Sequence, residues 1–275
     1  MRIDLHTHSH YSDGTLSPAD VVRRAHETGI KLMVLSDHDC VYGYAEAKAE
    51  GDKLGVTVLC GVEINTREDD THVLGYGVKP DSPALLRSLE EFRLRREQRI
   101  RGVIERLQGL GLEIGWEDVR SEAEKSRGQA VGRPHVADAL RRKKIVRTRQ
   151  EAFQKYLTKG KPGYVDPMGP TAEEAIAAIR GAGGTPVIAH PGAIFDVDDF
   201  KSFAAIGLGG LELYYPTHTC GTMSNLSEMA RAAGLVTTGG SDFHGPGTGR
   251  DKLAGFEAAP ELFAVLEPHL MGGLA

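Results

Sequence analysis

Short apolar segments rich in β-branched residues alternate with helical patterns along most of this chain. The segments cover residues 3–5, 32–35, 56–59, 73–76, 186–189, 208–213 and 235–238. Helix caps at Ser17, Thr171 and Ser224 precede helical patterns over residues 21–26, 175–179 and 226–232. Strands that alternate with helices predict a mostly parallel α/β sheet. A chain of 275 residues is long enough for one full α/β barrel, or for a barrel-like domain with an insertion.

The stretch from residue 81 to residue 161 interrupts this alternation. It predicts a long helix over residues 85–110 and shorter helices over 134–142 and 149–157. It carries 20 Lys and Arg against 12 Asp and Glu, a net charge of +8, whereas the rest of the chain carries −13. We therefore predict a barrel formed by residues 1–80 and 162–275, with a helical insertion domain over 81–161 that recognises the substrate. The basic charge suits an anionic substrate, but it is equally typical of solvated helix surfaces.

Composition narrows the class of protein. No apolar run approaches the roughly 20 residues of a membrane helix, and no secretory signal pattern is visible. We expect a cytoplasmic protein without membrane contact, and no obligate protein partner is evident. Cys40, Cys60 and Cys220 are widely spaced, which argues against a disulfide framework and against a thiolate zinc site. Any metal ion must therefore be held by nitrogen and oxygen atoms.

Residues of metal-ligating type follow five of the predicted strands. They are His6 and His8, His38, Glu63, His190, and Asp242 with His244. The two histidines of the first pair alternate along a strand, so both rings can reach one cation. The carboxyl ends of the strands form one face of an α/β barrel, so residues that are scattered in sequence meet there. This recurrence predicts a metal site at that face.

Two further candidates need a separate argument. His72 opens a strand instead of following one, but the polar segment 66–70 before it predicts a hairpin that places Glu63 beside His72. Asp13 lies in Ser12-Asp13-Gly14, directly after the paired histidines, and is either a turn aspartate or a ligand; we keep it as a ligand. Histidine and carboxylate ligands fit Mn²⁺, Fe²⁺ or Zn²⁺. Nine candidates exceed the needs of one ion, so more than one is implied.

Several of these residues stand in motifs that resemble those of the polymerase and histidinol phosphatase (PHP) family. The motifs are Asp4-Leu5-His6-Thr7-His8-Ser9, Ser36-Asp37-His38-Asp39, Gly61-Val62-Glu63-Ile64, Ala189-His190-Pro191 and Gly240-Ser241-Asp242-Phe243-His244-Gly245. The resemblance spans nearly the whole chain. Ser12-Asp13-Gly14, His72-Val73-Leu74-Gly75, Arg133-Pro134-His135 and Leu213-Tyr214-Tyr215-Pro216 are similar to the branch of nucleotide phosphatases that act on AMP or nucleoside 3′,5′-bisphosphates. That branch also includes a 5′-to-3′ exoribonuclease.

This resemblance implies a distorted seven-stranded (β/α) barrel with a trinuclear metal centre. One ion would be held by His6, His8, Glu63 and Asp242, a second by Asp13, His38 and His244, and a third by Glu63, His72 and His190. A metal-bound hydroxide is then the expected nucleophile on a nucleotide phosphate, while the cations neutralise the phosphoryl oxygens. No Ser-His-Asp arrangement is seen among the motifs.

The expected substrate contacts are Asp39, Arg96, Arg99, Arg133, His135 and His218. Arg133 and His135 are the leading candidates because both belong to a nucleotide-branch motif and arginine binds phosphate through two nitrogens. Arg96 and Arg99 on the long helix either reach the same phosphate or pair with nearby glutamates. His218 is either a proton donor or phosphate contact, or a hydrogen-bonded structural histidine. Asp39 either supports the ligand loop or contacts a ribose.

Three other functions remain open on the sequence. The first is hydrolysis of histidinol phosphate, and the second is stepwise 5′-to-3′ exonuclease activity on short RNA, for which a basic channel gives strong salt dependence. The third is a non-catalytic, polymerase-associated metal-binding module.

Overall fold

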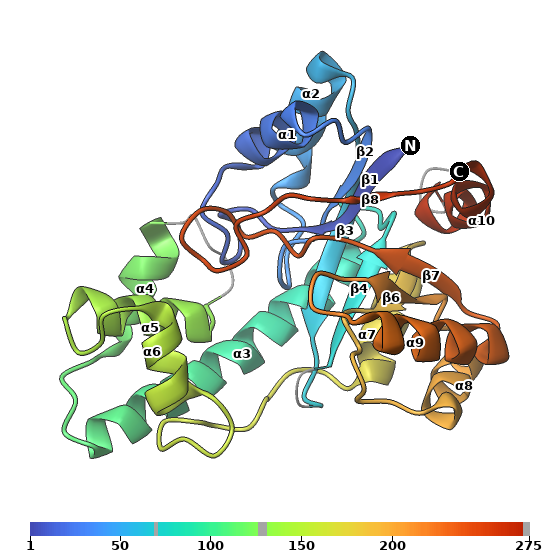
Figure 1. Ribbon diagram of the computed structural model, residues 1–275. Helices are drawn as coiled ribbons and strands as arrows, with labels where there is room; N and C mark the ends of the chain where they lie inside the picture. The colour runs from blue at the N-terminus through green and yellow to red at the C-terminus, as the bar shows by residue number, and fades with distance from the viewer. Residues whose placement is uncertain (69–70, 126–130, 272–275) are drawn as a thin grey trace.

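The seven predicted strands form one sheet in the computed structural model, which describes residues 1–68, 71–125 and 131–271 (Figure 1). The strands are β1 (Arg2–Thr7), β2 (Leu32–Leu35), β3 (Thr57–Asn65), β4 (His72–Tyr76), β5 (Thr185–Ile188), β6 (Gly210–Tyr214) and β7 (Val236–Gly239). Their order in the sheet follows the chain. An eighth strand, β8 (Phe256–Glu257), pairs antiparallel with β1. Our count of seven was therefore one short, because a two-residue strand is too short to show an alternating pattern.

The sheet is parallel except around β4 and at β8. Strands β1 to β3 pair in parallel, as do β5 to β7, whereas β4 runs antiparallel to both of its neighbours. The predicted hairpin between β3 and β4 is confirmed, although Asp69 and Asp70 of its turn lie outside the described residues. β3 runs to Asn65, so Glu63 lies inside the strand instead of after it.

The sheet curls until its two sides meet in a nearly closed barrel. The backbone N–H of His8 donates to the carbonyl of Phe243 at 2.8 Å, beyond the end of β7. Gly240 lies so close to β1 that a Cβ atom there would stand 2.3 Å from the Cβ of His6. This approach brings the residues after β7 to the residues at the end of β1.

Helices cover the outside of the barrel (Figure 1). They are α1 (Pro18–Glu27), α2 (Tyr44–Leu54), α7 (Ala172–Gly181), α8 (Val197–Ala205), α9 (Cys220–Ala233) and α10 (Pro260–Met271). The caps at Ser17 and Thr171 are confirmed, since each hydroxyl accepts a backbone N–H of its helix. The predicted cap at Ser224 is wrong. α9 begins at Cys220, and its cap is Thr219, whose hydroxyl accepts the backbone N–H of Thr222.

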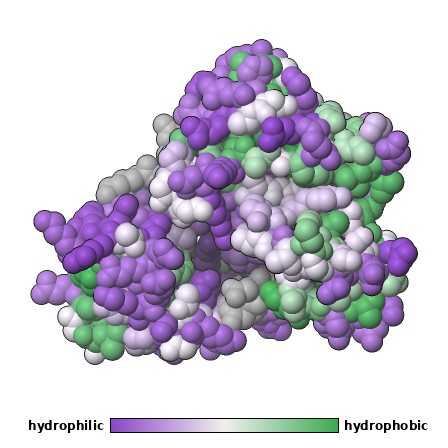
Figure 2. Space-filling view, in the orientation of Figure 1, coloured by the Kyte–Doolittle hydropathy of each residue, from purple (hydrophilic) through white to green (hydrophobic). Residues whose placement is uncertain are grey.

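The predicted insertion forms a helical lobe beside the barrel (Figure 1). It contains α3 (Pro83–Gly109), α4 (Trp116–Lys125), α5 (Arg133–Arg142), α6 (Arg149–Ala152) and the π-helical turn η1 (Phe153–Leu157). α3 joins the two parts: Leu89 packs in the barrel core, whereas Ile100 and Leu107 pack against Val136 and Leu140 in a second core. Figure 2 shows the surface hollowed between the hydrophilic lobe and the barrel. None of the helices in the described ranges has the length and apolar character needed to cross a bilayer.

Candidate metal centre

The nine predicted ligands lie together at one end of the barrel. His6 and Glu63 lie near the carboxyl ends of β1 and β3, and His72 begins the antiparallel β4. The other ligands lie on loops that follow the carboxyl ends of strands. Three residues of these loops adopt a left-handed backbone: Asp39 with φ 50°, His190 with φ 29° and Asp242 with φ 52°. Such conformations are costly for residues other than glycine and persist where the surroundings enforce them. The site therefore rests on a constrained backbone.

The first group comprises His6, His8, Glu63 and Asp242. The Nε2 atoms of His6 and His8 lie 3.1 Å apart. Glu63 Oε2 is 3.2 Å from the first of these nitrogens and 3.1 Å from the second, and Asp242 Oδ1 is 3.4 Å from each. All four side chains are buried. Four donor atoms thus converge on a point that one cation can occupy.

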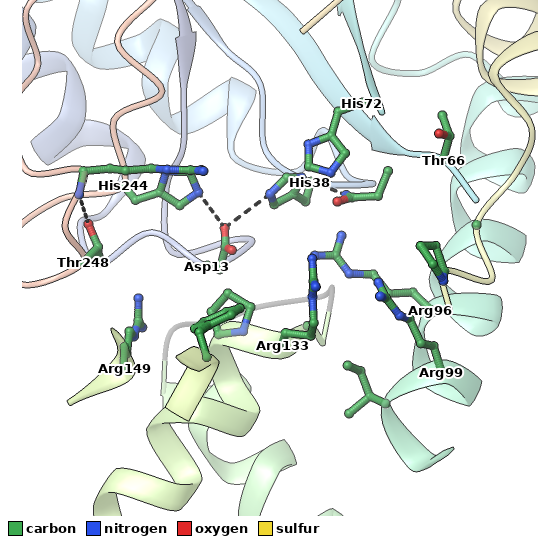
Figure 3. Close-up of a pocket in the computed structure, with 18 of the residues that line it drawn as sticks. Asp13, His38, Thr66, His72, Arg96, Arg99, Arg133, Arg149, His244 and Thr248 are labelled. Carbon is green, nitrogen blue, oxygen red and sulfur yellow. Dashed lines mark hydrogen bonds and ion pairs between the residues drawn. The ribbon is translucent and has the colours of Figure 1, made fainter. Parts of the chain in front are cut away.

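The second group comprises Asp13, His38 and His244, with His8 beside them. Asp13 Oδ1 lies 3.2 Å from His244 Nε2 and 3.8 Å from His38 Nε2, as the dashed lines of Figure 3 show. Asp13 is 6% exposed. It is therefore no ordinary solvated turn residue.

Glu63 also belongs to the third group, with His72 and His190. Its Oε1 atom lies 2.8 Å from His72 Nδ1 and 3.3 Å from His190 Nε2. The two oxygens of one carboxylate thus face different groups, a geometry suited to bridging two ions. The contact with His72 follows from the antiparallel pairing of β3 and β4.

The chemistry of these side chains fits divalent cations. Four buried atoms of the cluster have no hydrogen-bond partner among the described residues: His8 Nδ1, Asp13 Oδ1, Glu63 Oε2 and Asp242 Oδ1. Buried polar atoms are rarely left in this state unless they bind an ion or water. Burial opposes a charge on His8, yet the nearby carboxylates of Asp242 and Glu63 raise its pKa to about 9. The carboxylates thus attract positive charge, which metal ions can supply.

Glu212 contacts two of the predicted ligands, and our sequence analysis missed it. The side chain is fully buried in β6. Its Oε1 lies 3.2 Å from His6 Nδ1, and its Oε2 accepts the backbone N–H of His190 at 2.8 Å. Nδ1 of His6 thus faces Glu212, and Nε2 faces the other ligands of the first group. The available signal was an acidic residue between two leucines in an apolar strand.

Asp37 holds the loop that carries Asp13. Its carboxylate accepts the N–H and the hydroxyl of Ser9 and the hydroxyl of Ser12, each at 2.7 Å. Our sequence analysis quoted Asp37 within a motif but gave it no role. The three hydrogen bonds assign it to positioning this loop.

A cavity of about 610 Å³ opens from the cluster toward the helical lobe. Asp13, His38, His72 and His244 lie on its barrel side (Figure 3). Five arginines also line it: Arg96, Arg99, Arg133, Arg149 and Arg250. Among the described residues that line this cavity, Asp13 is the only carboxylate. The cavity therefore combines possible metal ligands with a strongly cationic wall.

Four of the six predicted substrate residues lie at or directly behind this wall. Arg96, Arg99 and Arg133 line it. Arg96 Nη1 donates to Asp39 Oδ2 at 2.9 Å, so Asp39 is the anchor of that arginine. Arg99 donates through Nε to the carbonyl of Val165 at 2.9 Å.

The two predicted histidines, by contrast, do not line the cavity. His135 is 2% exposed, and its Nδ1 accepts the N–H of Gly132 at 3.1 Å, at the start of α5. His218 Nδ1 lies 2.9 Å from the carbonyl of Leu213, and its Nε2 accepts the N–H of Gly192 at 3.3 Å. Both nitrogens of His218 thus bond to backbone groups, in line with the structural alternative that the sequence left open.

Arg149 and Arg250 are lining residues that our sequence analysis missed. Arg250 Nη1 lies 2.7 Å from Asp242 Oδ2, which also accepts the Tyr215 hydroxyl at 2.9 Å. The Tyr215 hydroxyl thus supports a carboxylate of the cluster. Neither arginine stands in a motif.

Comparison with known proteins agrees with this arrangement. Residues 4–158 match the PHP domain family. The chain is 35% identical over 268 residues to a 3′,5′-nucleoside bisphosphate phosphatase of Chromobacterium violaceum. This alignment covers 94% of this chain and 93% of that protein. The chain is 33% identical over 253 residues to the 5′-3′ exoribonuclease Rnm of Salmonella typhimurium, covering 88% of this chain and 85% of that protein.

A solved structure has the same fold. It is described as an amidohydrolase from Chromobacterium violaceum with bound SO₄ and no metal. The TM-score is 0.84 at 34% identity, over 96% of this chain and 97% of that one. On its motifs, its fold and these relatives, the chain belongs to the PHP family.

Proposed function

We propose that this chain is a metal-dependent phosphatase that removes a phosphate group from nucleotides, AMP or nucleoside 3′,5′-bisphosphates. The observation that carries the proposal is the cavity between the barrel and the helical lobe. Possible metal ligands and Arg250 line its barrel side. The helical lobe contributes four more arginines, Arg96, Arg99, Arg133 and Arg149. The name of the Chromobacterium violaceum relative supports a nucleotide substrate.

The proposed centre binds two or three divalent ions, Mn²⁺, Fe²⁺ or Zn²⁺, through the nine ligands. Three overlapping groups of donor atoms support this number, with Glu63 and His8 each in two of them. Nitrogen and oxygen donors without a thiolate suit all three metals. When bound, such ions activate a water molecule and neutralise the charge on phosphoryl oxygens.

The chain's own residues bind and orient the substrate. A phosphate ester that reaches the cluster lies beside Asp13 and His244, with Arg96 and Arg133 on the facing helices. Arginine forms paired hydrogen bonds with phosphate oxygens and stays charged at all physiological pH values. The ion pair between Arg96 and Asp39 holds one guanidinium in place before the substrate arrives. We assign substrate recognition to residues 81–161 on this basis.

The remainder of the cavity suits a nucleoside. Phe92, Phe153 and Met168 line it together with Pro134 and Pro167. Aromatic and apolar side chains of this kind provide surfaces for a base. A volume of about 610 Å³ lies within the range of small-molecule pockets.

A second candidate is 5′-to-3′ exoribonuclease activity on short RNA. It is favoured by the similarity to the Salmonella typhimurium enzyme and by the same arginines. Histidinol phosphate hydrolysis and a non-catalytic role draw no comparable support from the cavity.

The experiment is a reconstitution assay. Protein stripped of metal is loaded with Mn²⁺, Fe²⁺ or Zn²⁺ and offered AMP, adenosine 3′,5′-bisphosphate, histidinol phosphate and a short 5′-phosphorylated RNA. We expect phosphate release from the nucleotides, loss of activity on chelation, and little activity in His190→Ala. A matched control is His26→Ala, at a helix end far from the ligands. Failure of the loaded enzyme on every substrate would refute the proposal, and nucleotide release from RNA with salt-sensitive rates would favour the exoribonuclease.

A further inference from the structure

We infer that Arg149 is an additional substrate-binding residue, which contacts the phosphate that lies at the metal centre. The inference rests on the proposed function, because it assumes a phosphorylated substrate in the cavity. Arg149 is the first residue of α6, in the helical lobe, and its side chain lines the cavity. In Figure 3 it extends toward the side occupied by Asp13 and Thr248.

The guanidinium is fixed from behind by one carboxylate. Nε of Arg149 donates to Asp138 Oδ1 at 2.8 Å, and Nη2 bonds to Asp138 Oδ2. Asp138 lies on α5 and is 7% exposed. This paired contact leaves Nη1, which has no hydrogen bond to any residue of the described ranges. An arginine held in this way loses little conformational entropy when it binds a phosphate oxygen.

A purely structural ion pair accounts less well for this arrangement. Asp138 has a second partner, because Arg141 Nη2 lies 3.2 Å from its Oδ1 on the same helix. The carboxylate would therefore stay paired without Arg149. Arg141 is exposed and does not line the cavity. Only one of the two arginines that share Asp138 thus faces the substrate space.

The position of Arg149 separates it from the other arginines of the lobe. Arg96, Arg99 and Arg133 lie together on the side of α3 and the start of α5, whereas Arg149 lies across from them, on the side of Thr248 and Asp13 (Figure 3). A phosphate at the Asp13 and His244 end of the cavity would therefore have a cation on each side. Since that phosphate is the one to be hydrolysed, Arg149 should affect every substrate to a similar degree.

The test compares Arg149→Met with Arg141→Met, which removes the other partner of Asp138. We expect Arg149→Met to lower kcat/KM about 10- to 100-fold, the loss typical of one hydrogen bond to a charged group, and by similar factors for AMP and adenosine 3′,5′-bisphosphate. Arg141→Met should stay within about twofold of the wild type. Arg149→Lys should recover only part of the loss, because one ammonium group cannot serve both Asp138 and a phosphate.

Titration calorimetry with inorganic phosphate, on Mn²⁺-loaded protein, separates this inference from the proposed function. We expect about 10-fold weaker phosphate binding in Arg149→Met than in Arg141→Met. This result would support the inference even if no nucleotide were hydrolysed. Equal phosphate binding in the two variants, equal kinetics, or no phosphate binding by the wild type would overturn it. Melting temperatures of the metal-free variants verify folding, and Arg149→Lys replaces Arg149→Met if the latter does not fold.

Discussion

Replacing Glu212 with glutamine tests whether the buried carboxylate positions the metal ligands. The carboxylate carries two hydrogen bonds at once, from His6 Nδ1 and from the backbone N–H of His190. Glutamine has nearly the same shape but only one oxygen. Its amide NH₂ must therefore face one of these two donors, and the negative charge is lost.

The expected loss of metal affinity depends on which groups of ligands Glu212 contacts. His6 belongs to the first group and His190 to the third, whereas the second group contains neither. Removal of a hydrogen-bond partner behind a metal ligand weakens metal binding about 10- to 100-fold, or about 1.4 to 2.7 kcal/mol. We therefore expect Glu212→Gln to weaken the ions of the first and third groups by this factor and to leave the second largely unchanged.

The assay is competition with a fluorescent zinc chelator, together with elemental analysis of the metal retained after gel filtration. At equal chelator concentration the wild type should retain more ions than Glu212→Gln. The ion of the second group should be retained equally by both proteins. Glu228→Gln, on the exposed face of α9, has the same change in charge and should match the wild type. Equal affinity of all sites in Glu212→Gln would refute the assignment of Glu212 as a positioning residue.

Three further predictions concern packing, the ligand loop and pH. Gly240→Ala places a methyl group against His6 and should destabilise metal-free protein by about 1 to 3 kcal/mol in denaturant unfolding, whereas Gly109→Ala has no atom within 4 Å to meet and should not. Asp37→Asn removes the charge that holds the loop after β1 and should reduce the number of retained ions by one in elemental analysis, without a change in helix content by circular dichroism. Burial lowers the pKa of His135, so below about pH 6.5 the unfolded chain binds a proton there that the folded chain does not. The His135 contribution to stability should therefore fall from pH 7.5 to 5.5. Over this range the free energy of unfolding should change less favourably in the wild type than in His135→Asn, by up to about 1.4 kcal/mol per pH unit, and an equal change in the two proteins would contradict the prediction.

Much of the fold could be predicted because its signals are local. Seven apolar segments and the caps at Ser17 and Thr171 depend on neighbouring residues alone, and each appears where predicted. The hairpin that brings His72 to Glu63 also followed from a local turn. The strand β8 could not be found in this way. It exists because the chain returns to β1 after more than 250 residues, a contact without local pattern.

The residues of the candidate site also differ in whether local sequence signals reveal them. Histidines and acids after strands are recognisable because a barrel sends strand ends to one face. Arg149 reaches the cavity only because the lobe packs beside the barrel, and Arg250 reaches it from the irregular loop after β7. Neither position directly follows a predicted strand, so residue type and spacing give no indication of it. His135 and His218 show a different limit, because residue type does not reveal which partners a ring nitrogen takes. Whether 81–161 is a separate domain stays a prediction.

Buried carboxylates hold the ligand loops in place by accepting backbone N–H groups. The carboxylate of Glu212 accepts the backbone N–H of His190. The carboxylate of Asp4 accepts the backbone N–H of Ser241 at 2.9 Å, next to Asp242 with its left-handed backbone conformation. Burial raises the pKa of Asp4 to about 6, so its ionised form is costly there. Divalent cations offset the charge of such a cluster and bind only the folded chain, so they should stabilise it by mass action. We therefore expect metal binding and folding to be coupled in this protein.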